Sequence, residues 1–353
     1  MTNLYSSDLY IKDIAVVANT DIPWYLLQDK CILITGATGL IGSFLIDVIM
    51  HKNIRDHLNC TILAVGRDRR KAEKRFDIFF KENNFEFIEC DINHSVKVLY
   101  DNKFDYMVHL ASNTHPLAYA SDPIGTISSN IIGTNNLLEC SSVLSVKRFI
   151  FASSNEIYGE NRGDVELFDE EYCGYINSNT LRAGYPESKR CGEALCQAYR
   201  VQKNMDVVIA RLTRSYGPTM KMDDSKALSQ FIKNGLEGQN IILKSEGSQY
   251  YSYTYVADAV SGLLTVLLKG INGDAYNIAY QESDIKLKDL AELIAEYSGT
   301  KVVHEIPSAL EKSGYSTATK ARLSGAKLKQ LGWTPLFDIR EGIRHTLNIL
   351  KSN

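Results

Sequence analysis

The chain has 353 residues, of which 44% are hydrophobic and 23% charged, and its formal net charge is −3 at pH 7. This length and composition are those of an ordinary globular protein, with one large α/β domain or two smaller ones. The small net charge gives no reason to expect nucleic acid or an anionic membrane as a partner. No apolar run approaches the roughly 20 residues that a membrane span needs.

The first 29 residues predict short helices rather than a targeting sequence. Apolar residues recur through residues 5–27, and Pro23 is placed to open a second short helix at Trp24–Leu27. Four aspartates in this stretch argue against a signal or transit peptide. The seven cysteines are scattered singly, so neither a disulfide framework nor a zinc site is expected. We expect a cytoplasmic protein without a metal, whose N-terminal segment is a helical cap or a subunit contact.

An apolar run of strand length, residues 31–34, leads into three glycines spaced three apart, and an apolar-periodic helix follows. Glycines in such a turn let the backbone approach a pyrophosphate closely, and the start of the helix offers free N–H groups. A tight connection between strand and helix is the other interpretation. The dinucleotide interpretation assigns cofactor binding to Gly36, Thr38, Gly39, Leu40, Ile41 and Gly42.

The second predicted strand, residues 61–65, ends at Gly66 and Arg67. In a dinucleotide fold this end meets the adenosine ribose, where an acidic side chain accepts from a 2′-hydroxyl and an arginine accommodates a 2′-phosphate. Arg67, with the basic run at residues 69–71 close by, favours NADP(H) as the cofactor. Asp68 keeps NAD(H) as the alternative. The same charges would also suit the solvated first turn of a helix that runs to about residue 80.

Further strands are predicted at residues 85–90, 106–110, 148–152 and 207–210, with a long helix over residues 123–144. This alternation predicts a parallel, doubly wound sheet whose ligands lie beyond the carboxyl ends of the strands. His109, in an apolar strand, is interpreted as a packed core histidine. After about residue 211 the alternation loosens into a mixed α/β region. The strand ends and the long helix add these residues to the predicted cofactor site: Asp91, Ile92, Leu110, Ala111, Ser112 and Asn130.

A tyrosine and a lysine four residues apart, Tyr185 and Lys189, open another predicted helix and lie on one face of it. A lysine ammonium near a phenol favours the phenolate and lowers the pKa of the tyrosine. The tyrosine can then exchange a proton with a substrate hydroxyl near neutral pH, while Ser154 hydrogen bonds the same oxygen. Tyr185 and Lys189 are both predicted to touch the cofactor, whose nicotinamide transfers the hydride. An exposed pair on a helix would show the same spacing.

These motifs together give the chain a family likeness from about residue 30 to the C-terminus. It resembles the extended short-chain dehydrogenase/reductases, the NAD-dependent epimerase/dehydratase family. Within that family, residues 168–190 look most like the UDP-glucuronate decarboxylase branch. The likeness is supported by residues 109–112, 130–134, 153–159, 216–218, 255–258 and 331–333.

The resemblance implies an α/β fold with a Rossmann-type doubly wound parallel sheet and a smaller mixed α/β C-terminal domain. The NAD(P)-binding domain would comprise residues 1–211 and about 250–279, including the N-terminal helical extension. Residues 212–249 and 280–353 would form the domain that grips a nucleotide-linked sugar. Members of the family are commonly dimers built on a four-helix interface, so a homodimer or a higher homo-oligomer is expected.

Four positions narrow the expected activity. Asn155 stands where the sugar-nucleotide dehydratases have an acidic residue, so dehydration is not expected, whereas Glu156 is kept as in the decarboxylases. Glu156 is therefore a catalytic candidate, or it holds the loop after the fifth strand. The decarboxylases carry an arginine where this chain has Tyr251, and most relatives have asparagine where it has Arg214. We expect Arg214 to bind the substrate diphosphate in place of position 251, the alternative being an ion pair with a local carboxylate.

The catalytic residues expected from these arguments are Ser154, Tyr185, Lys189 and Glu156, with Asn155, Arg214 and Tyr251 at the substrate. The predicted function is net reduction by NADPH of a keto group on a nucleotide-linked sugar, such as a CDP-ketose giving a CDP-alditol for surface polysaccharide. The alternative is an epimerase or a decarboxylase that recycles bound NAD. A catalytically silent nucleotide-binding regulator is the alternative of another class.

Overall fold

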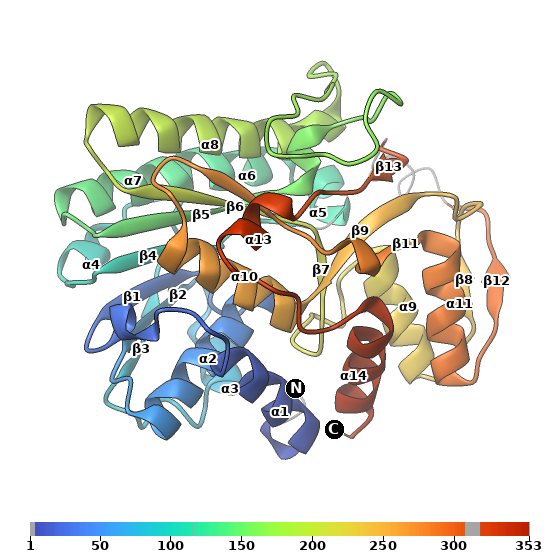
Figure 1. Cartoon of the computed structure of the whole chain (residues 1–353), viewed down its shortest axis with the longest axis horizontal. Helices are drawn as coiled ribbons and strands as arrows, with labels where there is room; N and C mark the ends of the chain where they lie inside the picture. The colour runs from blue at the N-terminus through green and yellow to red at the C-terminus, as the bar shows by residue number, and fades with distance from the viewer. Residues whose placement is uncertain (1–3, 115, 308–317, 353) are drawn as a thin grey trace.

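A seven-stranded parallel sheet forms the centre of the computed structural model, which describes residues 4–114, 116–307 and 318–352 (Figure 1). The strand order is β10-β6-β5-β4-β1-β2-β3, and every neighbouring pair is parallel. This order reverses between β1 and β4, which confirms the predicted doubly wound sheet and places a ligand crevice at their carboxyl ends. The strands are β1 (Cys31–Thr35), β2 (Thr61–Gly66), β3 (Phe85–Glu89), β4 (Tyr106–His109), β5 (Arg148–Ser154), β6 (Val207–Leu212) and β10 (Ala275–Ile278).

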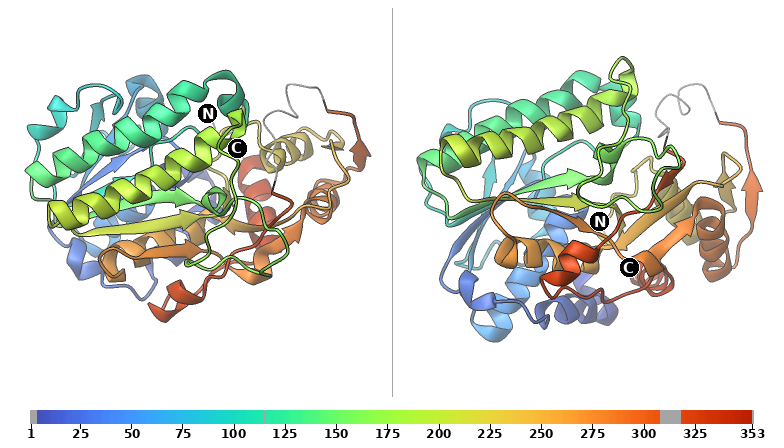
Figure 2. Two further views of the ribbon diagram at one scale, coloured as in Figure 1. Left: turned by 90° about the horizontal axis from the view of Figure 1, so that it is seen from above. Right: turned by 45° about the horizontal axis from the view of Figure 1, so that its top comes forward.

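Helices cover both faces of this sheet, with α6, α7 and α8 on one face and α2 and α10 on the other (Figures 1 and 2). Each face forms its own hydrophobic cluster, because successive side chains of a strand point to opposite faces. Leu33 of β1 belongs to one cluster, whereas Ile32 and Ile34 belong to the other. The helices of this layer are α1 (Asp8–Ala18), α2 (Leu40–Asp56), α3 (Arg69–Arg75), α4 (Lys97–Tyr100), α5 (Pro116–Ser121), α6 (Pro123–Ser128), α7 (Thr134–Val143), α8 (Gly184–Gln202) and α10 (Val256–Lys269).

The predicted helix over residues 123–144 is interrupted. A π-helical turn, Ser129–Gly133, separates α6 from α7. Such turns insert a residue into the helix and often occur at functional sites. Here the turn contains Asn130, whose side chain accepts a hydrogen bond from Ser112 and donates one to Ser188. The turn therefore links the loop after β4 to α8.

Helix α3, which follows β2, is shorter than the helix to about residue 80 that the sequence suggested. It ends at Arg75 rather than near residue 80. The rings of Phe76 and Phe79 turn inward and pack against Phe85 at the start of β3. Burial of these aromatic rings outweighs the continuation of a short surface helix.

The C-terminal half adds a smaller region beside the sheet (Figure 2). Strand β9 is its centre, because it pairs with β7, β11 and β13. The expected domain boundaries stay a prediction, although β9 pairs in this smaller sheet and α10 and β10 join the large one. The elements are β7 (Arg214–Tyr216), α9 (Ala227–Leu236), β8 (Ile241–Leu243), β9 (Tyr250–Tyr255), β11 (Asp284–Lys286), α11 (Leu287–Ser298), β12 (Val302–His304), β13 (Lys320–Ala321), α13 (Ala326–Gln330) and α14 (Ile339–Lys351).

The N-terminal segment packs onto the rest of the chain as a cap. Its helix α1 is followed by a short 3₁₀ helix at Trp24–Leu27, where a second short helix was predicted. Buried Asp47 of α2 accepts hydrogen bonds from Tyr10 of α1 and from Arg75. Asp13 of α1 accepts a hydrogen bond from Tyr255 at 2.5 Å, which ties the segment to the smaller region.

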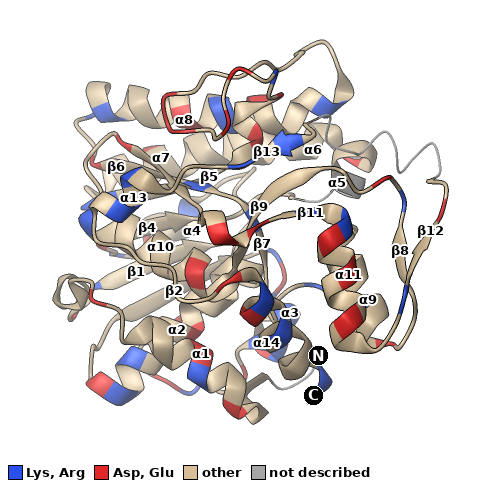
Figure 3. Cartoon of the chain, turned by 45° about the vertical axis from the view of Figure 1, so that its right-hand side comes forward, with Lys and Arg blue, Asp and Glu red and all other residues tan. Residues whose placement is uncertain are grey.

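Figure 3 shows positions of Lys and Arg and of Asp and Glu interspersed along the helices that face the viewer. None of the helices within the described ranges is long and apolar enough to cross a lipid bilayer. All seven cysteines are free thiols.

Candidate active site

The turn between β1 and α2 leaves its backbone open to a ligand. Gly36 has a φ of 69°, and a side-chain carbon there would lie 2.8 Å from the backbone nitrogen of Ala111. A side-chain carbon at Gly42 would lie 2.4 Å from the carbonyl oxygen of Gly36. Gly39 begins the helix, and no side chain caps it. Only glycine fits the two crowded positions, so this turn suits the diphosphate of a dinucleotide.

A cavity of about 540 Å³ extends from this turn along the carboxyl ends of the strands. It brings together nearly the whole predicted cofactor site, and Ser154, Asn155, Glu156 and Arg214 line it as well. Asn130 does not line it and acts through Ser112, to which it is hydrogen bonded at 2.8 Å. The predicted cofactor residues on its wall are Gly36, Thr38, Gly39, Leu40, Ile41, Gly42, Arg67, Asp91, Ile92, Leu110, Ala111, Ser112, Tyr185 and Lys189.

At the end of β2 the structure separates the two residues that favoured different cofactors. The side chain of Asp68 caps α3 by accepting from the backbone N–H of Lys71 at 3.0 Å. Arg69 donates to the carbonyl oxygen of Phe87 at 2.8 Å. Of these charged residues only the exposed Arg67 contributes to the cavity wall. The cavity therefore presents a cation at this strand end.

His109 is a core residue, as predicted. Its ring nitrogens lie 2.9 Å from the hydroxyl of Thr35 and 3.0 Å from that of Thr134. Burial, and then the charge of Lys189, lower the pKa of His109 to about 3. The imidazole is therefore neutral and links β1, β4 and α7.

The catalytic candidates Ser154, Tyr185 and Lys189 converge on the cavity. The ammonium of Lys189 donates to the carbonyl oxygen of Ala152 at 2.8 Å and lies 6.0 Å from the centre of the Tyr185 ring. Burial lowers the pKa of Lys189 to about 7. Burial and the charge of Glu156 raise the pKa of Tyr185, against the hydrogen bond of Ser154.

The expected lowering of the phenol pKa by Lys189 is therefore wrong for this structure. Desolvation of the buried ring outweighs a lysine that itself loses charge near neutral pH. Burial therefore favours the protonated form of the Tyr185 phenol at neutral pH.

Glu156 has a partner that the sequence did not indicate. Both of its carboxylate oxygens accept from Nη2 of Arg182, at 2.8 and 2.7 Å. The guanidinium of Arg182 also lies over the ring of Tyr119, which stacks on Tyr185. Arg182 stands three residues before Tyr185, inside the segment that carried the family likeness, whereas nothing in the sequence singles out Tyr119.

A second cavity of about 280 Å³ adjoins the first, and the two share Asn155, Glu156 and Arg214. The guanidinium of Arg214 lies 3.5 Å from the centre of the Tyr251 ring, and the Tyr251 hydroxyl donates to the carbonyl oxygen of Ala318. Nη1 of Arg214 is buried without a hydrogen-bond partner, and no carboxylate pairs with Arg214 among the described residues. Tyr251 lines neither cavity and supports Arg214 from behind.

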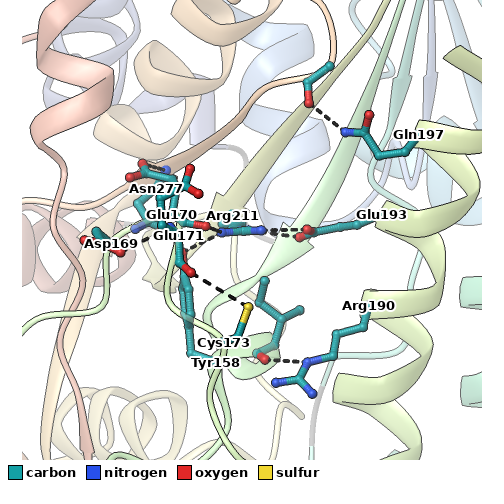
Figure 4. Close-up of polar contacts among 12 residues, drawn as sticks. Tyr158, Asp169, Glu170, Glu171, Cys173, Arg190, Glu193, Gln197, Arg211 and Asn277 are labelled. Atoms are coloured by element: carbon teal, nitrogen blue, oxygen red, sulfur yellow. Dashed lines mark hydrogen bonds and ion pairs between the residues drawn. The ribbon is translucent and has the colours of Figure 1, made fainter. Parts of the chain in front are cut away.

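A buried polar network holds the wall of the second cavity against α8 (Figure 4). Arg211 of β6 pairs with Glu193 of α8 and donates to the Tyr158 hydroxyl at 2.9 Å and to the Glu170 carbonyl oxygen at 2.7 Å. Arg190 donates to the backbone carbonyl oxygens of Ile157 and Gly174. The loop segment over residues 155–180 is therefore anchored to α8, the helix that carries Tyr185.

The sequence comparison agrees with this arrangement. A family model described as the NAD dependent epimerase/dehydratase family matches residues 32–279. The chain belongs to this family. The expected resemblance is thus confirmed, and the glycine turn, Ser154, Tyr185 and Lys189 lie within the matched residues.

Similar members of the epimerase/dehydratase family include one animal protein and one plant protein. UDP-glucuronic acid decarboxylase 1 of Xenopus tropicalis is 33% identical over 91% of this chain and 72% of its own length. UDP-glucuronic acid decarboxylase 6 of Arabidopsis thaliana is 31% identical over 88% of this chain and 86% of its own.

Two solved structures share the fold at 22% identity. The UDP-glucuronic acid 4-epimerase of Bacillus cereus, in complex with UDP-glucuronic acid and NAD, gives a TM-score of 0.78 over 91% of this chain and 99% of its own. A double mutant of the dTDP-glucose 4,6-dehydratase DesIV of Streptomyces venezuelae, with NAD bound, gives a TM-score of 0.78 over 91% of this chain and 97% of its own.

Proposed function

We propose that this protein catalyses redox chemistry at one carbinol carbon of a nucleotide-linked sugar, with a nicotinamide dinucleotide that is regenerated in each cycle. The reaction is that of an epimerase or a decarboxylase. The observation that carries the proposal is the convergence of Ser154, Tyr185 and Lys189 on a cavity that begins at the glycine turn. The similarity to UDP-glucuronic acid decarboxylases supports the recycled dinucleotide.

In this proposal each polar side chain has a distinct task. A nicotinamide dinucleotide held at the glycine turn would supply the hydride chemistry. The phenol of Tyr185 exchanges a proton with the reacting oxygen, and Ser154 hydrogen bonds that oxygen. Asn155 cannot donate the proton that eliminates water, so dehydration is not proposed. Arg214 binds the diphosphate through the guanidinium that Tyr251 supports.

A second candidate is net reduction by NADPH, such as conversion of a CDP-ketose to a CDP-alditol for surface polysaccharide. It is favoured by Arg67, which contributes a cation to the cavity while Asp68 caps α3. A protonated Tyr185 is also the form that donates a proton to a ketone. In this case NADPH is a consumed substrate.

The first experiment denatures freshly purified protein and identifies the released dinucleotide by mass spectrometry. Stoichiometric NAD supports the recycling enzyme, whereas an empty site that binds NADPH better than NADH supports net reduction. Turnover is then measured with UDP-glucuronate, UDP-glucose and a CDP-linked ketose. Dinucleotide binding without turnover of any nucleotide sugar would contradict both candidates and favour a regulatory protein.

We further propose that the protein acts in the cytoplasm as a homodimer or higher homo-oligomer, built on α6, α7 and α8. Apolar side chains are exposed on these helices, with Ile124 at 78%, Val143 at 59% and Val201 at 75%. Burial of such side chains stabilises a subunit contact. Sedimentation of the wild type and of Val201→Glu tests this: a monomeric wild type contradicts the proposal.

A further inference from the structure

Four side chains from three parts of the chain form a continuous column at the phenol of Tyr185. The ring of Tyr119, from α5, stacks on that of Tyr185 with 4.7 Å between centres and an interplanar angle of 26°. The guanidinium of Arg182, from the turn Leu181–Ala183, lies 4.8 Å from the centre of the Tyr119 ring. Arg182 then donates to both carboxylate oxygens of Glu156, at 2.8 and 2.7 Å.

This column is shielded from solvent. The side chains of Arg182 and Glu156 are 14% and 19% exposed, and Tyr119 and Tyr185 are buried. Little water screens the ion pair, so its geometry is held more firmly than that of a surface pair. Nε of Arg182 is buried and has no hydrogen-bond partner among the residues that the structure describes. The orientation of the guanidinium is therefore set by Glu156 and Tyr119.

We propose that Arg182 is a positioning residue of the active site, which holds Glu156 in an ion pair and Tyr119 in a stack and thereby fixes the phenol of Tyr185 for proton transfer. The proposal rests on the proposed function for its kinetic consequence. Its structural consequence, the placement of the Tyr185 ring, does not depend on which reaction the protein catalyses.

The two charged side chains of the column, Glu156 and Arg182, have opposite effects on the pKa of the Tyr185 phenol. Burial and then the carboxylate of Glu156 raise the pKa of Tyr185, whereas Ser154, Arg182 and Tyr119 lower it. The ammonium of Lys189 lies 6.0 Å from the centre of the Tyr185 ring. Burial is the main cause that raises the pKa of Tyr119, and the charge of Asp224 adds to it. Because Glu156 is paired, it is not available as a free base, and the pair acts on Tyr185 as a unit.

A double-mutant cycle in the pH profile of kcat tests the kinetic arm. In the direction of alcohol oxidation, Arg182→Gln should move the profile to higher pH and Glu156→Gln to lower pH, each by about one unit. The double variant should return close to the wild-type profile, because both opposing charges are gone. Loss of a merely structural contact lowers kcat without these opposite shifts. Unshifted profiles in active single variants would overturn the proposal.

The structural arm needs no turnover. Fluorotyrosine is incorporated at position 185, and its fluorine resonance reports the neighbouring ring of Tyr119. Arg182→Gln should shift the resonance, whereas Arg162→Ala should not. Arg162 is the matched control, since it lies 3.8 Å from the centre of the Tyr175 ring in a similar stack. A resonance unmoved in Arg182→Gln would overturn the proposal.

Arg182→Lys separates the two contributions of the guanidinium. Lysine keeps the charge but lacks the planar group that stacks on Tyr119. It should restore the pH profile while leaving the fluorine resonance shifted. If the wild type turns over no nucleotide sugar, the proposed function is wrong, and the resonance alone still decides whether Arg182 positions Tyr185.

Discussion

Arg214→Ala is the most informative single substitution for the substrate site. The guanidinium lies 3.5 Å from the centre of the Tyr251 ring, and within the described part of the chain its buried Nη1 has no hydrogen-bond partner. Strand pairing explains the placement. Arg214 is opposite Tyr253 in the parallel pair of β7 and β9, and Tyr251 is two residues along the same face of β9. The stack holds the guanidinium ready for an anion at the junction of the two cavities.

The expected magnitude follows from the hydrogen bonds that such a group makes. A hydrogen bond to a charged group contributes about 1.5–3 kcal/mol, which is about a 10- to 150-fold change in Kd. Because the stack fixes the guanidinium beforehand, little side-chain entropy is lost on binding and the upper half of the range is expected. Arg214→Lys should lie between wild type and alanine, since a point charge replaces the planar fork.

Isothermal titration with UDP, CDP and inorganic pyrophosphate measures these affinities without any turnover. Arg162→Ala serves as the control, because its stack on Tyr175 is similar but its guanidinium is not part of either cavity wall. Circular dichroism at rising temperature checks that each variant is folded. An unchanged Kd in Arg214→Ala, or an equal loss in the control, would refute the assignment of the diphosphate to Arg214.

Three further predictions concern the cofactor side. Arg67→Ala should weaken NADPH binding about 10-fold and leave NADH within about 2-fold in a fluorescence titration, because an exposed contact to a 2′-phosphate contributes near the lower limit for charged hydrogen bonds. Exposed Arg70→Ala is its control, and equal losses for both dinucleotides would count against the prediction. Gly42→Ala places a carbon 2.4 Å from the carbonyl oxygen of Gly36; it should abolish dinucleotide binding and lower the free energy of unfolding by about 1–3 kcal/mol, so an unchanged urea midpoint would contradict it. Burial lowers the pKa of Lys189 to about 7, so the unfolded chain binds more protons up to about pH 10 and the free energy of unfolding rises with pH there, by up to about 1.4 kcal/mol per unit. Lys189→Met should lose this rise, which urea unfolding at pH 7 and 9 measures; equal slopes in both proteins would contradict it.

Local sequence patterns were sufficient for most of the fold. The apolar run before Gly36, predicted as a strand, is β1. The helix over residues 123–144 was only partly predictable, because its π-helical turn depends on hydrogen bonds between Asn130 and two distant serines. No local periodicity encodes those partners.

Most of the predicted cofactor residues line one cavity, and the requirements of the glycine turn among them are local. A glycine turn at the end of a strand, followed by a helix start, is contiguous in the sequence, and fourteen of the fifteen predicted residues line the cavity. The substrate side was less predictable. Its residues come from strands and turns that are far apart in the chain, and their partners depend on how those segments pack.

The sequence by itself determined the doubly wound sheet and the place of the glycine turn, and it singled out Ser154, Tyr185 and Lys189, which line one cavity. Only the tertiary structure decided the partners: Glu156 is neutralised by Arg182, and Arg214 lies over Tyr251. It also decided that burial, rather than the nearby lysine, governs the pKa of Tyr185. The physical reason is that residue type and spacing fix local backbone structure, whereas charge pairing and desolvation depend on distances between segments that only packing sets.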